Sequence, residues 1–175
     1  MKNKLWYFTD DDGTFVSGGA DKINALYFPL ANEVFMSSVT PDLHGDAKTS
    51  QDSFLYEPVS RLDLSNSRSS RNFWVRTSSG KIWSATGVSK DLEQIESDVV
   101  NISAGLLWHR ARRENKKIGF AADILTFVPS TGEPAEITSL TLTNISSRPI
   151  SFSATAAIPI YARSAENIRE DRKST

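Results

Sequence analysis

Two arginines, Arg68 and Arg71, lie among four serines and two asparagines in the polar segment 65–72. Guanidinium groups present paired N–H donors that suit phosphate and carboxylate, so this segment could form an anion site. In the alternative interpretation, the hydroxyls and amides satisfy the backbone of a loop while the arginines pair with neighbouring acids such as Asp63. The sequence favours the second interpretation, in which the segment braces the fold.

Acid–base and metal chemistry has few candidates in this chain. His44 and His109 are the only histidines, there is no cysteine, and neither histidine has a second such ligand at metal-binding spacing. His109 is predicted to be a strand residue packed beside Trp108 rather than a general base. Residues 9–13 hold three aspartates without the alternation of a calcium loop and are predicted to form a turn. No catalytic residue, metal site or cofactor site is predicted within the chain.

Tryptophan side chains offer a different chemistry, because the apolar face of a pyranose lies well on an indole ring. Trp74 is the sugar-stacking candidate, and it is expected on the strand face opposite Phe73 and Val75. Burial in the core is the alternative for every tryptophan of a small β domain. The four are Trp6, Trp74, Trp83 and Trp108.

The composition is typical of a soluble globular protein, and 175 residues suffice for one domain. A net charge of −1 gives no electrostatic case for nucleic acid or a membrane surface as a partner. The first residues reach acidic positions after four apolar ones, which is too short for the core of a signal peptide. No apolar run approaches the length of a membrane span, so a cytoplasmic location is expected.

Hydrophobic patterning indicates the elements that would position these side chains. Turn residues separate alternating segments from residue 99 onward, and the last segment, 149–161, has one apolar face predicted to be buried. Residues 32–63 lack clean periodicity and are predicted to form a long loop packed over a sheet, within which 54–56 could form a short strand. Asp21 is predicted to cap a short helical turn that Pro29 would end. Strands are predicted at 4–8, 14–17, 73–76, 81–84, 99–103, 106–112, 117–128, 136–144 and 149–161. Many short strands with regular turns predict an all-β antiparallel sandwich over residues 1–175.

Several segments then show a family resemblance. They are residues 32–41, 45–49, 54–60, 66–75, 127–129, 134–137 and 140–144. Together they resemble the N-terminal region of glycoside hydrolase family 94, the cellobiose-phosphorylase-like enzymes. The stretches Met-Ser-Ser-Val-Thr-Pro at 36–41 and Ser-Arg-Asn-Phe-Trp-Val at 70–75 are most similar to the 1,2-β-oligoglucan phosphorylases.

The resemblance implies a β-sandwich of the super-sandwich type, followed by linker helices and an (α/α)6 barrel that holds the active site. It implies that inorganic phosphate, as co-substrate, cleaves a β-glucosidic bond with inversion, while an aspartate of the barrel acts as general acid. The barrel and its general acid are expected outside these residues, and the sandwich is expected to be incomplete at its C-terminal end. This chain alone is therefore expected to have no catalytic activity.

Family members are usually homodimers in which a loop of one sandwich reaches the substrate pocket of the partner protomer. The resemblance implies that this loop falls within residues 164–172. Five of its residues are then substrate-binding candidates for a β-gluco-oligosaccharide: Glu166, Asn167, Arg169, Asp171 and Arg172. Two alternatives stay open, a solvated loop at this position and a stand-alone carbohydrate-binding or assembly module.

Overall fold

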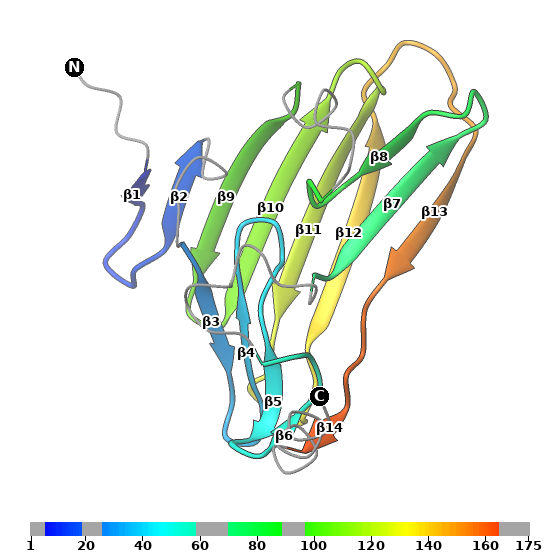
Figure 1. The fold of residues 1–175 in the computed structure, drawn as a ribbon. Helices are drawn as coiled ribbons and strands as arrows, with labels where there is room; N and C mark the ends of the chain where they lie inside the picture. Colours follow the sequence, from blue (N-terminus) through cyan, green and yellow to red (C-terminus); the bar gives the residue numbers. More distant parts are fainter. Residues whose placement is uncertain (1–5, 19–25, 59–69, 89–96, 165–175) are drawn as a thin grey trace.

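A computed structural model describes residues 6–18, 26–58, 70–88 and 97–164. Within these ranges the regular structure is all strand, and the strands form two packed layers (Figure 1). The predicted all-β antiparallel sandwich is confirmed. The described residues contain no helix that is long and apolar enough to cross a membrane.

The first layer is a six-stranded antiparallel sheet. In pairing order its strands are β1 (Trp6–Phe8), β2 (Phe15–Gly18), β9 (Val99–Gly105), β10 (Trp108–Asn115), β11 (Phe120–Phe127) and β12 (Ile137–Asn144). The strands β9 to β12 form a meander of seven- and eight-residue strands, and these are the longest elements of the described chain. The sequence predicted each of them, because their length lets the alternation of polar and apolar residues show.

The second layer consists of two smaller sheets. The three-stranded sheet has the order β13 (Phe152–Ala157), β7 (Asn72–Thr77) and β8 (Ile82–Ser84). The five-stranded sheet has the order β14 (Arg163–Ser164), β6 (Ser53–Phe54), β5 (Ala47–Ser50), β4 (Met36–Val39) and β3 (Phe28–Ala31). The predicted strands 73–76 and 81–84 pair with each other as β7 and β8, and Gly80 at φ +85° lies in the turn between them.

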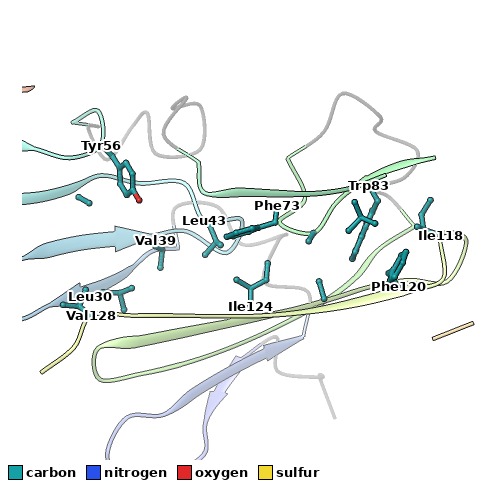
Figure 2. Close-up of a cluster of buried hydrophobic side chains, with 14 of the residues drawn as sticks. Leu30, Val39, Leu43, Tyr56, Phe73, Trp83, Ile118, Phe120, Ile124 and Val128 are labelled. Carbon is teal, nitrogen blue, oxygen red and sulfur yellow. The ribbon is translucent and has the colours of Figure 1, made fainter. Parts of the chain in front are cut away.

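The main core fills the space between the layers, as Figure 2 shows. Phe120 and Ile124 of β11 face Phe73 and Val75 of β7, and the ring of Phe120 stacks on the fully buried Trp83 at 6.5 Å between centroids. Burying a large apolar side chain of this kind contributes about 1.5–3 kcal/mol. The core thus ties the long meander to both small sheets.

The prediction of a long loop over residues 32–63 is wrong. Three short strands, β4, β5 and β6, lie within this range, and β3 precedes it. Each has two to four residues, too few for an alternating pattern to be recognised. Pro29 ends no helix but lies within β3, an edge strand, where its missing N–H removes no ladder hydrogen bond. Asp21 and the predicted helical turn as far as residue 25 lie outside the described residues.

Strand β13 differs from its prediction. All six of its residues are exposed, although Phe152 reaches the core edge and packs edge-on against Phe120 at 5.0 Å. The reason is that β13 pairs with β7 at the margin of the three-stranded sheet, and no described strand pairs with its other edge. The predicted strand 106–112 also begins two residues later, because Leu107 adopts φ +64° in the turn before β10.

Candidate functional site

The arginine of the polar segment, Arg71, is buried and paired. It lies just before β7 with a side-chain exposure of 1%, against 4% for its partner Glu136, which precedes β12. Arg71 Nε donates to Glu136 Oε1 at 2.9 Å and Nη2 donates to Oε2 at 2.7 Å. This two-pronged geometry is the strongest form of an arginine–carboxylate contact. The bracing interpretation is therefore confirmed for Arg71, with Glu136 in place of the acid suggested by the sequence.

The remaining donors of Arg71 reach the second layer. Nη2 donates to the hydroxyl of Ser37 on β4, and Nη1 donates to the carbonyl of Gly45, both at 2.9 Å. The hydroxyl of Ser37 in turn donates to Glu136. The guanidinium also lies 4.3 Å from the ring centroid of Tyr56, within cation–π range. We name these five residues the Arg71 centre.

Gly45 makes this arrangement possible. Its φ is +136°, and a Cβ there would lie 2.0 Å from the backbone oxygen of Ser38. No side chain fits at that distance, so the loop between β4 and β5 can approach Ser38 only through a glycine.

Burial, and next the charge of Glu136, raises the pKa of Tyr56. In the Arg71 centre, a carboxylate, a hydroxyl, a carbonyl and an aromatic ring surround the guanidinium. The positive charge of Arg71 is therefore neutralised and hydrogen-bonded by residues of this chain.

A second buried ion pair lies at the other end of the core. Arg113 Nη1 donates to Asp98 Oδ2 at 3.1 Å, with side-chain exposures of 5% and 1%. Asp98 also accepts from Asn115 at 2.6 Å and from the indole N–H of Trp83 at 3.2 Å. Burial raises the pKa of Asp98 despite these donors. Gly87, at φ +94°, leaves the space that the Arg113 guanidinium occupies.

Neither histidine forms a catalytic arrangement with described residues. His109 on β10 is fully buried, its ring lies 4.9 Å from Phe28, and neither ring nitrogen has a described hydrogen-bond partner. Burial lowers its pKa from 6.5 to about 4, so it stays neutral. It is a strand residue as predicted, but it faces the interior while Trp108 lies on the opposite face. His44 Nδ1 lies 2.9 Å from Asp42 Oδ1, at ion-pair distance but without hydrogen-bond alignment.

The outer face of the six-stranded sheet carries a groove with a volume of about 450 Å³. Arg110 and Arg112 project there from β10, since they alternate with the buried residues of that strand. Arg110 donates twice to Asp123 of β11, from Nε and Nη2, each at 2.7 Å. Strand β9 lies on the other side of β10 (Figure 1) and contributes Asn101 and Ser103, and the N-terminal hairpin adds the ring of Tyr7. Sequence reasoning missed this groove, although the alternation Arg-x-Arg on one strand face was a readable signal.

The predicted sugar-binding residues have different outcomes. Trp74 is half-buried on the outer face of β7, opposite Phe73 and Val75 as expected. Trp83 is fully buried in the core, whereas Trp6 is 48% exposed and stacks on Phe15. The structure does not bring the tryptophans together into one platform among the described residues. Glu166, Asn167, Arg169, Asp171 and Arg172 lie outside the described residues.

No group of three or more histidine, aspartate or glutamate side chains that could hold a metal ion occurs in the described ranges. No protein-family model matches the chain, and no curated protein matches it in sequence.

Proposed function

We propose that this chain is the N-terminal, non-catalytic β-sandwich region of an inverting β-glucoside phosphorylase, a glycosyltransferase-type enzyme of family 94. The substrates would be β-linked gluco-oligosaccharides and inorganic phosphate, with catalysis in a separate barrel. The role of this region is to support that barrel, to contribute to a homodimer and to complete the substrate pocket through residues 164–172. The protein would act in the cytoplasm.

One observation carries the proposal, the composition of the Arg71 centre. Five segments that carry the family resemblance each contribute one of its members: 32–41, 45–49, 54–60, 66–75 and 134–137. Segments that are scattered along the chain thus converge on one buried ion pair. The residues that carry the resemblance thus include those that brace this fold, as expected if the resemblance reflects a shared fold.

The interior position of Arg71 also supports a structural role for this region. Its donors contact Glu136, Ser37 and Gly45, and the ring of Tyr56 covers its face. An arginine held in this way is unsuited to bind a reacting phosphate, since its burial keeps a substrate anion from reaching it. This agrees with a division of labour in which the phosphate site belongs to the barrel.

The direct test is phosphorolysis by the complete natural protein. Incubated with β-1,2-gluco-oligosaccharides and inorganic phosphate, it should release α-glucose 1-phosphate, because inversion of a β-linkage gives the α-phosphate. The 175-residue chain alone should release none. Failure of the complete protein to phosphorolyse β-1,2-, β-1,3- or β-1,4-linked gluco-oligosaccharides would overturn the proposal.

A further inference from the structure

The outer-face groove combines polar side chains whose charges balance. Arg110, Arg112 and Asp123 line the groove, and Glu114, which lies beside the lining on β10 and pairs with Arg112, supplies the second negative charge. Arg112 Nη2 donates to Glu114 Oε1 at 2.8 Å, and its Nη1 lies 3.9 Å from Asp123 Oδ2. Because the charges cancel locally, the groove has little attraction for an isolated anion or cation. A neutral polar ligand is the better match.

The same side chains are held in place before any ligand arrives. Both oxygens of Asp123 accept from Arg110, so the planes of the carboxylate and the guanidinium are fixed relative to each other. The Asp123 side chain is 17% exposed, whereas the Arg110 and Arg112 side chains are 54% and 44% exposed. Side chains that are already fixed by internal contacts but still accessible lose less conformational entropy when a ligand binds.

Hydrogen-bonding capacity remains after the internal contacts are made. A guanidinium has five N–H donors, and the contacts to Asp123 use two of those on Arg110. The amide of Asn101 and the hydroxyl of Ser103, both of which line the groove, can donate and accept. Sugar hydroxyls also donate and accept, so a surface of this composition can satisfy several of them at once.

An aromatic ring completes the groove on the side of β1. Tyr7 lines the groove and is 54% exposed, and it is held in register opposite Val16 of β2. Exposed aromatic rings contribute apolar contact area while their polar tip stays in water. The C–H face of a pyranose can pack on such a ring while its hydroxyls meet the polar side chains. We propose that this groove is a non-catalytic binding site for a neutral oligosaccharide.

The groove is a sugar site beyond the proposed function, which assigns sugar contacts only to residues 164–172. The groove inference rests on that function solely for the choice of β-glucan as probe. It is also distinct from the sugar-stacking role predicted for Trp74, because Trp74 lies in the other layer of the sandwich. The groove would hold a second part of a long β-glucan, or a second chain, apart from the reacting bond.

The test is a titration of the isotopically labelled 175-residue chain with a β-1,2-linked gluco-oligosaccharide of four to six units, followed by backbone amide NMR. We expect saturable shifts confined to the amides of β1, β2, β9, β10 and β11, with a dissociation constant of about 1 mM or below. A second titration with inorganic phosphate should give no saturable shift in these strands.

Two groove variants and one matched control sharpen the result. Tyr7→Ala and Arg110→Ala should each weaken sugar binding about 10-fold, the equivalent of one good contact. Arg76→Ala, which removes an exposed arginine from β7, should leave the affinity within about 2-fold, because a mutation in the other layer acts independently. Circular dichroism and thermal unfolding would verify the fold of each variant. If Arg110→Ala fails to fold, the shift map of the unsubstituted chain and Tyr7→Ala still decide the question.

Three results would overturn the inference. One is the lack of a saturable response at about 10 mM sugar, where a 1 mM site would be ~90% occupied. Another is binding that Trp74→Ala abolishes and Tyr7→Ala leaves intact. The third is phosphate binding in the groove without sugar binding. Each is separable from the proposed function, which stands or falls on release of glucose 1-phosphate by the complete protein and not on this groove.

Discussion

Arg71 and Glu136 are 65 positions apart in the sequence, yet they form a two-pronged ion pair that is almost sealed from solvent. The pair links the start of β7 in one layer to the start of β12 in the other. Through Ser37 and Gly45 it also reaches the five-stranded sheet. Three sheets are thus joined at one guanidinium, whose charge is matched by a carboxylate buried with it.

Removing the carboxylate of this pair should be severely destabilising. Glu136→Ala leaves the Arg71 cation buried without its counter-charge, and we expect the free energy of unfolding to fall by about 3–5 kcal/mol. Urea denaturation followed by circular dichroism measures the change. The matched control is Glu114→Ala, which removes an ion pair to the half-exposed Arg112 and should change stability by no more than about 1 kcal/mol. Equal effects of the two variants would contradict the role of the Arg71 centre.

Gly45 should tolerate no side chain. Gly45→Ala places a Cβ 2.0 Å from the oxygen of Ser38, and we expect a loss of more than about 3 kcal/mol or a failure to fold. Gly80→Ala is the control that distinguishes backbone strain from steric overlap. Gly80 also has a positive φ, but no atom lies within 4 Å of a Cβ added there. That control should cost only about 1–2 kcal/mol. Comparable losses in both variants would show that φ alone is responsible.

The buried His109 predicts a loss of stability in mild acid. In the unfolded chain it binds a proton below its ordinary pKa of 6.5, whereas in the folded chain it does so only below about 4. Between these values the unfolded state holds the extra proton, so stability present above pH 6.5 is lost as the pH falls towards 4. The full loss is on the order of 3 kcal/mol.

Denaturation curves at pH 7.5, 6.0, 5.0 and 4.0 would test this dependence against His109→Phe, whose ring can keep the contact with Phe28. The variant should lack most of the decline between pH 6.5 and 4 that the unsubstituted chain shows. Carboxylates contribute equally to both proteins and cancel in the comparison. Parallel curves for the two proteins would mean that His109 is not held neutral by the fold.

The two buried ion pairs should act independently. Tyr56 covers Arg71 and Trp83 donates to Asp98, and Figure 2 shows these two rings at opposite ends of the core. Tyr56→Leu and Trp83→Phe should each destabilise by about 1–2 kcal/mol, and the double variant by their sum within about 0.5 kcal/mol. A larger discrepancy in urea denaturation would reveal coupling through the core.

The sequence predicted the long strands of the meander and missed β3, β4 and β5 for a physical reason. In β10, Arg110 and Arg112 alternate with buried residues over eight positions, and such a repeat can be read without a structure. In β3 the strand has four residues and one is Pro29, so no period is visible and the proline suggests a break. These short strands are stabilised by burial of Leu30 and Val39 in the main core. That burial depends on contacts with residues distant in sequence, which local patterning does not reveal.

The candidate site was predictable only in part. The arginine of the polar segment attracted notice by its type, but its partner Glu136 is set by how β12 packs across the sandwich. Asp63 was the acid nearest in sequence, and sequence proximity has no bearing on a contact made between layers. The apolar alternation of β13 was real, yet exposure depends on which strands surround it, as the 45% exposure of Phe152 demonstrates.

The pairing of β2 with β9 has a consequence for synthesis of the chain. Gly18 pairs with Asn101, so the first hairpin leaves the ribosome ~80 residues before its partner strand, a wait of about 4–16 s at ordinary elongation rates. In the folded protein the rings of Trp6, Phe8 and Phe15 contact one another, and Phe15 also packs against Phe28 of β3. Because β2 joins the six-stranded sheet through β9 alone, the first two strands can take their places in that sheet only after β9 has been synthesised.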